Sequence, residues 1–104
     1  MLNKKKFYIN GQWVDPNSSE EINVINPATE ENCATISLGN QKDVDEAVNA
    51  AKKAFETWAF STKNERLELL EKLYENYKKR WNDIAEAITV EMGAPKDFAS
   101  KLQT

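Results

Sequence analysis

The chain has 104 residues, of which 40% are hydrophobic and 30% charged, with a net charge of −3 and one cysteine. This length allows one domain with a modest core. The charge balance has no basic excess, so nucleic acid is not an expected partner, and no apolar run is long enough to span a membrane. A single cysteine cannot form an internal disulfide, which fits a cytoplasmic protein.

Three consecutive lysines, Lys4 to Lys6, form the basic cluster near the N-terminus. We expect them to be a solvated, frayed end of the chain, and the alternative is a contact with phosphate or lipid. The three residues before them contain no apolar core, so we expect no secretory signal peptide.

A first β-hairpin is predicted by two short β-rich runs, Phe7–Ile9 and Gln12–Val14. The two residues between them are Asn10 and Gly11, the pair that best tolerates the positive φ angles of a type I′ turn. The sequence therefore predicts a tight hairpin here.

A second hairpin follows over residues 22–38. Ile22, Val24 and Ile25 predict a strand that ends at Pro27, because proline cannot continue a central ladder. After a polar turn, Cys33 to Leu38 predicts the returning strand. Residues 7–38 therefore form two hairpins.

The first predicted helix starts at Asn40, whose side chain can cap it, with Asp43 three residues later. Apolar residues then recur at spacings of three and four, which is typical of a helix with one apolar face. They are Val44, Val48, Ala51, Phe55 and Trp58.

A second helical run starts at Thr62, which forms a capping-box pattern with Glu65. Its apolar stripe consists of Leu67, Leu70, Tyr74, Tyr77, Trp81, Ile84 and Ile88. Asn82-Asp83 is a candidate break that would divide this run into two helices. Gly93 suits the left-handed position that ends a helix. A further helical pattern fills residues 96–104. Core packing is the favoured interpretation of Trp58 and Trp81, with a ligand platform that includes Trp13 as the alternative.

No active site is visible in the residues themselves. There is no histidine, so the commonest general base and metal ligand is missing. Cys33 is interpreted as a plain strand residue rather than a reactive thiol. Because the three glycines are isolated, neither a dinucleotide-binding fingerprint nor a phosphate-binding loop is possible.

Five stretches resemble, in order and at near-family spacing, the sequence pattern of the NAD(P)-dependent aldehyde dehydrogenases. They are FYINGQW at 7–13, NVINPATE at 23–30, DVDEAVNAAKKAF at 43–55, Arg66 followed by Leu70, and EMGAP at 91–95. Their family counterparts are F-I-N-G-x-W, V-x-N-P-A-T-x-E, D-V-D-x-A-V-x-A-A-x-x-A-F, R-x-x-x-L and E-x-G-x-P. The chain thus resembles the N-terminal segment of such an enzyme.

The resemblance implies an α/β fold: a single incomplete domain over 1–104, the N-terminal part of a Rossmann-like cofactor domain. We expect two β-hairpins at 7–38 followed by three to four α-helices at 41–104. The parent would oxidise an aldehyde to a carboxylic acid with NAD or NADP through a cysteine thioester. The family's nucleophile, base and cofactor site lie further along, so we expect no catalytic residue, no cofactor-binding residue and no bound cofactor here.

One minor site is implied by the same resemblance. Some family members hold a monovalent cation between a backbone carbonyl before the N-P pair and an acid of the E-x-G-x-P turn. The matching positions are Val24 or Ile25 for the carbonyl and Glu91 for the acid, and hard oxygen ligands suit such an ion. A further family ligand lies beyond Thr104, so the site is incomplete and a helix-terminal glutamate without an ion is the favoured interpretation.

Two other interpretations stay open. The chain could be a free-standing helical binding or scaffolding module, although an ending in mid-helix without a cap favours truncation. Alternatively, the parent could be an acylating or semialdehyde-specific member of the family. In a truncated chain the apolar stripes would be exposed, so the expected partners are the remainder of a dehydrogenase chain and further copies of this one.

Overall fold

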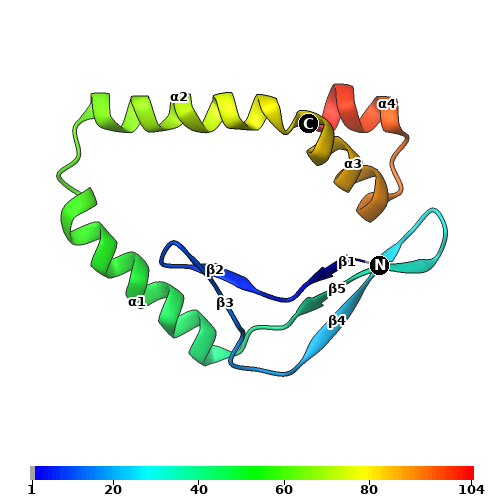
Figure 1. Ribbon diagram of the computed structural model, residues 1–104, viewed down its shortest axis with the longest axis horizontal. Coiled ribbons are helices and arrows are strands. Elements are labelled where there is room, and N and C mark those ends of the chain that lie inside the picture. The colour runs from blue at the N-terminus through cyan, green and yellow to red at the C-terminus, as the bar shows by residue number, and fades with distance from the viewer. Residues whose placement is uncertain (1) are drawn as a thin grey trace. The chain divides into compact units, whose positions relative to one another are not determined.

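A computed structural model describes residues 2–104 (Figure 1). Its elements are β1 (Leu2–Lys4), β2 (Phe7–Ile9), β3 (Gln12–Val14), β4 (Glu21–Asn26), β5 (Glu31–Ser37), α1 (Gln41–Trp58), α2 (Lys63–Lys79), α3 (Trp81–Met92), α4 (Lys96–Phe98) and the π-helix η1 (Ala99–Gln103). The two predicted hairpins and the helices after them are confirmed. The residues group into two compact units: residues up to 24 with 32–60, and residues 25–31 with 61–104.

The first unit contains a small sheet in which β5 lies between β1 and β4. β1 runs parallel to β5, with Leu2 opposite Ala34 and Lys4 opposite Ile36. The expectation that the lysine-containing end is frayed is therefore wrong for this segment. The pairing was not predicted because its partner strand lies about thirty residues further along the chain.

The β2–β3 hairpin has the predicted two-residue turn. Asn10 has φ +53° and Gly11 has φ +76°, as a type I′ turn requires. Tyr8 pairs with Trp13 across the hairpin, and their ring centroids lie 5.2 Å apart. The opposite face carries Phe7, whose ring would lie 3.4 Å from a Cβ at Gly39, directly before α1.

The predicted Asn40 cap and the predicted Thr62–Glu65 capping box are both present, and the Asn40 cap is also a full capping box. The Asn40 side chain accepts hydrogen bonds from the backbone of Lys42 and Asp43, and the Asp43 carboxylate accepts one from the Asn40 amide. Thr62 and Glu65 make the same reciprocal pair at the start of α2. These local contacts supply the backbone partners that the first turn of each helix lacks.

In the second unit, the break between α2 and α3 lies at Arg80. The expected break at Asn82-Asp83 is two residues too late, because Asp83 instead pairs with the Arg80 guanidinium at 3.0 Å in the first turn of α3. α3 ends at Gly93 in the left-handed conformation, with φ +68°, as predicted. The indole of Trp81 donates to the Ser100 carbonyl at 3.0 Å and thereby ties α3 to η1.

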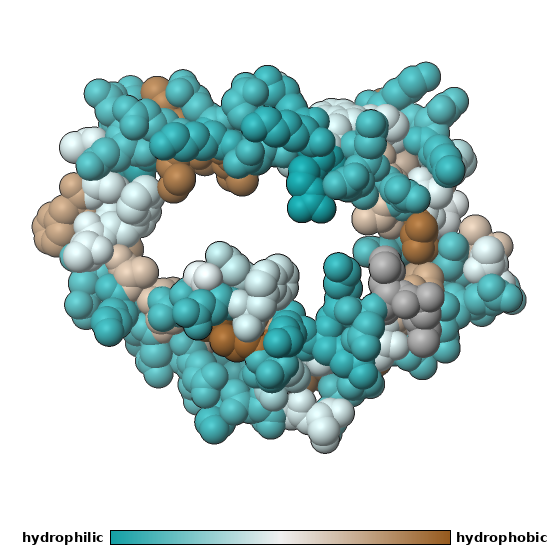
Figure 2. Space-filling model, in the orientation of Figure 1, coloured by the Kyte–Doolittle hydropathy of each residue, from teal (hydrophilic) through white to brown (hydrophobic). Residues whose placement is uncertain are grey.

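The buried apolar side chains of the described residues are only Ala34, Ala85 and Ala99. Figure 2 shows apolar side chains at the surface, including a patch along α2. Trp81 is half-buried, but Trp58 is 45% exposed, so the expectation of core packing is wrong for Trp58. Within residues 2–104, no helix combines the length and apolar character needed to cross a membrane.

Candidate functional site

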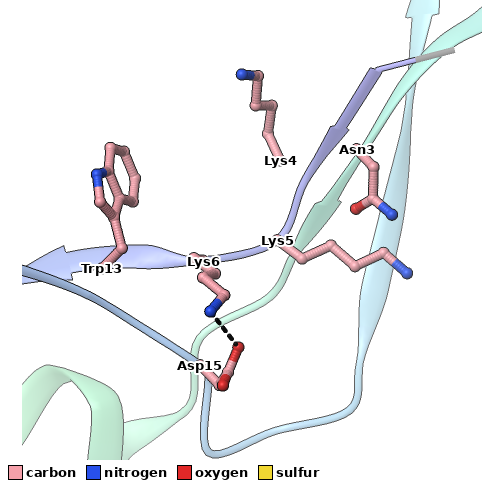
Figure 3. A pocket seen from close by; sticks show the side chains of 6 residues that line it. All are labelled: Asn3, Lys4, Lys5, Lys6, Trp13 and Asp15. Atoms are coloured by element: carbon pink, nitrogen blue, oxygen red, sulfur yellow. Dashed lines mark ion pairs between the residues drawn. The ribbon is translucent and has the colours of Figure 1, made fainter.

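A pocket of about 520 Å³ in the first unit lies beside the lysine cluster (Figure 3). Its lining residues are Asn3, Lys4, Lys5, Lys6, Trp13 and Asp15. Figure 3 shows Trp13 and Lys4 rising on the same side of the strands, while Lys6 turns toward Asp15. No nucleophile paired with a general base lines this pocket.

Two of the three lysines have an acidic partner. Lys5 pairs with Glu21 at 2.6 Å, and Lys6 pairs with Asp15 at 3.5 Å. These pairs are exposed, so each contributes little to stability. Lys4 is held in the sheet by the strand pairing of β1, and the next two lysines are held beside it by these ion pairs.

The buried carboxylate of the first unit is that of Asp43, which is 5% exposed. It accepts hydrogen bonds from the Asn40 amide at 2.9 Å and from the Asn17 amide and side chain at 2.8 and 2.9 Å. The amide of Asn40, then that of Asn17, hold the pKa of Asp43 below its usual value. Asp43 therefore fastens the loop after β3 to the start of α1, which is a structural task.

Sequence reasoning found half of this arrangement. The spacing of Asn40 and Asp43 predicted the cap, but the contact with Asn17 joins residues 26 positions apart. A carboxylate has several acceptor sites, and only the folded chain shows which loop uses the remaining ones.

Of the predicted cation ligands, Ile25 and Glu91 belong to the second unit, and the alternative carbonyl, that of Val24, belongs to the first. Ile25 lies in β4 near the Asn26 turn, and Glu91 lies in the last turn of α3. A Cβ at Gly93 would lie 3.0 Å from the Ala28 backbone nitrogen, so the ends of β4 and α3 are close. Within the described residues no group of three His, Cys, Asp or Glu side chains could hold a metal ion. The monovalent cation site, which depends on a backbone carbonyl, stays a prediction.

Cys33 lies in a strand, as predicted. Its Sγ donates a hydrogen bond to the Val24 carbonyl at 3.3 Å across the β4–β5 pair. In this contact the thiol is a small, half-buried hydrogen-bond donor.

Comparison with known proteins decides the family. The family model described as "Aldehyde dehydrogenase family" matches residues 13–103. The chain belongs to the aldehyde dehydrogenase family. Among the curated aldehyde dehydrogenases, a 3-succinoylsemialdehyde-pyridine dehydrogenase of a Pseudomonas species is 50% identical over 95 residues, which is 91% of this chain and 20% of that protein.

Solved aldehyde dehydrogenases have the same fold. The enzyme of Bartonella henselae is 55% identical with a TM-score of 0.97, over 99% of this chain and 22% of that one. Aldehyde dehydrogenase C of Pseudomonas syringae, solved with NAD⁺ and octanal, is 40% identical with a TM-score of 0.93, over 95% of this chain and 20% of that one. The chain spans about a fifth of the length of these relatives, and its α/β fold is theirs.

Proposed function

We propose that this chain serves as the opening segment of an NAD(P)-dependent aldehyde dehydrogenase, one that oxidises an aldehyde to a carboxylic acid through a cysteine thioester. The observation that carries the proposal is the family match over residues 13–103, supported by the neighbour with a TM-score of 0.97. Relatives solved with NAD⁺ support that cofactor for the whole protein.

The segment's own part is structural. Its hairpins and capped helices present apolar side chains for a larger partner, and the described residues contain no nucleophile–base pair and no glycine-rich phosphate loop. We therefore expect the 104-residue chain alone to be inactive and to bind no cofactor. In the longer protein, the backbone carbonyl of Val24 or Ile25 and the carboxylate of Glu91 would contribute oxygen ligands to a monovalent cation.

Two measurements test this proposal. The purified chain, mixed with an aldehyde and NAD⁺ or NADP⁺, should produce no reduced cofactor by absorbance, and aldehyde-dependent reduction would refute the structural role. In the native host, an antibody against this segment should detect a cytoplasmic polypeptide about five times heavier than 11.9 kDa, because the relatives are about five times longer. That species, once purified, should oxidise an aldehyde.

The second candidate function is a helical binding or scaffolding module. It is favoured by one observation, that helix α2 contains no buried residue. A native species of 11.9 kDa without dehydrogenase activity would support it over the first proposal. In either case we propose that the free chain binds copies of itself, because exposed apolar patches of this kind favour association.

A further inference from the structure

The turn of the β2–β3 hairpin contains a chemically labile pair of residues. Asn10 alone among the asparagines of the chain is followed by glycine. In such a pair the backbone nitrogen of the glycine can attack the side-chain amide of the asparagine, because no Cβ shields that nitrogen and the glycine backbone rotates freely. Asparagine is one of the thermolabile residues of proteins. The Asn10-Gly11 turn is therefore where spontaneous deamidation of this chain should begin.

The reaction needs only water. A bond forms between the Gly11 nitrogen and Asn10 Cγ, while the bond from Cγ to the side-chain nitrogen breaks and that nitrogen leaves as ammonia with the proton of the Gly11 amide. Water then opens the resulting five-membered imide ring. Cleavage of the new bond gives aspartate at position 10. Cleavage at the main-chain carbonyl gives isoaspartate, in which the backbone runs through the former side chain.

The folded turn opposes closure of that ring. Closure requires the Gly11 nitrogen and Asn10 Cβ to be nearly eclipsed about the Cα–C bond of Asn10. The φ angles of Asn10 and Gly11 are +53° and +76°. In a type I′ turn the first central residue has a ψ of about +30°, which sets the nitrogen and the Cβ about 150° apart around this bond. The restriction comes from the turn itself, so it holds whether or not another surface covers the hairpin.

The turn keeps this geometry as long as its strands are paired. Ile9 lies opposite Gln12 beside the turn, and Tyr8 lies opposite Trp13 one step further, with ring centroids 5.2 Å apart. Among the described residues, β2 and β3 form a sheet of two strands, and an isolated hairpin of that kind is only marginally stable. Local opening of the hairpin is therefore the step that frees the ψ angle of Asn10.

We propose that Asn10 is a deamidation site, which the paired β2–β3 hairpin protects and which reacts when the hairpin opens. The two products differ in their effect on the hairpin. Aspartate before Gly11 still suits a type I′ turn. Isoaspartate lengthens the two-residue turn by one chain atom, so the turn no longer fits the register in which Tyr8 faces Trp13. Conversion to isoaspartate thus leaves a permanent mark of hairpin opening.

The first test compares the folded and the unfolded chain. The purified chain is kept at mildly alkaline pH in buffer or in guanidinium chloride, and deamidation at each asparagine is followed by digestion and mass spectrometry. Asn10 should react faster than the other asparagines in guanidinium chloride, and several times more slowly in buffer. No reaction at Asn10 in guanidinium chloride overturns the site, and equal rates in the two solutions overturn the protection.

The second test weakens the hairpin without changing its turn. Tyr8→Ala removes the ring that faces Trp13, and Tyr8 is 63% exposed, so no buried cavity results. The rate at Asn10 in buffer should rise about two- to fivefold, the range expected for loss of one cross-strand aromatic pair. The matched control is Tyr74→Ala, because Tyr74 is 61% exposed but lies in α2. This control should leave the rate at Asn10 unchanged.

The outcomes identify the step that controls the reaction. A rate that Tyr8→Ala leaves unchanged overturns hairpin opening as the controlling step. Equal acceleration by Tyr74→Ala also overturns it, because the reaction would then follow the stability of the chain as a whole. None of these results bears on the dehydrogenase proposal, which depends on the longer native protein.

A third test examines the products. The aspartyl and isoaspartyl forms of the aged chain are separated by reversed-phase chromatography and refolded. Asn10→Asp and the aspartyl form should keep the near-ultraviolet circular dichroism of the Tyr8–Trp13 ring pair, because the turn is retained. The isoaspartyl form should lose this signal, and an unchanged signal there overturns the loss of register.

Discussion

Gly93 offers the sharpest test of how the second unit is held together. It ends α3 with φ +68°, a conformation that residues with a Cβ rarely adopt. An added Cβ would also lie 3.0 Å from the Ala28 nitrogen, 3.1 Å from Pro27 Cγ and 3.2 Å from Ala28 Cβ. Gly93→Ala should therefore destabilise the unit in two ways, through its backbone and through the contact with the β4–β5 turn.

The size of each effect follows from the geometry. The left-handed conformation costs an alanine about 1–2 kcal/mol relative to glycine. Overpacking against a backbone atom adds about 1–3 kcal/mol, because the Ala28 nitrogen cannot rotate away as the end of a long side chain could. The expected loss in free energy of unfolding for Gly93→Ala is thus about 2–5 kcal/mol.

Gly11 provides the matched control. Its φ of +76° is nearly the same, but nothing lies within 4 Å of an added Cβ. Gly11→Ala should therefore lose only the backbone term, about 1–2 kcal/mol. Gly93→Asn separates the backbone contribution from the contact contribution at the site itself. Asparagine tolerates the left-handed conformation but still places a Cβ close to Ala28.

Urea unfolding followed by tryptophan fluorescence measures these losses. Trp81 is the tryptophan of the second unit, and Trp13 reports on the hairpin that contains Gly11, so each is kept alone in a background where the other two are phenylalanine. Equal losses for Gly93→Ala and Gly11→Ala would show that the contact with Ala28 is unimportant. A neutral Gly93→Ala would refute both parts of the argument.

Three further predictions concern single side chains. The hydrogen bonds from Asn40 and Asn17 lower the pKa of Asp43 in the folded chain. The stabilisation that its carboxylate provides is therefore present above about pH 4 and is lost as the pH falls through the folded-state pKa. In Asp43→Asn, the urea concentration at the midpoint of unfolding should depend less on pH over this range. The Thr89 hydroxyl is buried without a hydrogen-bond partner among the described residues, so Thr89→Val should raise the melting temperature or leave it unchanged. Thr62→Ala removes the α2 cap and should lower helicity in circular dichroism, at a cost of about 1 kcal/mol.

The features predicted correctly from the sequence are those decided by neighbouring residues. The Asn10-Gly11 turn, the Asn40 cap, the Thr62–Glu65 capping box and the left-handed Gly93 each depend on a few neighbouring positions. Their backbone requirements are met by particular residue types, so the residues reveal the conformation.

The features that were missed depend on distant residues. β1 exists because Leu2–Lys4 pairs with β5, and no periodicity in three residues could indicate that pairing. The role of Asn17 in holding Asp43 has the same origin. The boundary between α2 and α3 lies at Arg80, whereas the sequence predicted it at Asn82-Asp83. Residues that favour helices continue on both sides of Arg80, so only the geometry of the cap locates the boundary.

The apolar stripes show where local and distant information meet. Their spacing predicted helices correctly, yet the expectation that Trp58 packs in a core is wrong, because a stripe indicates that a face needs cover and not which surface covers it. In relatives about five times longer, that surface can come from the rest of the chain.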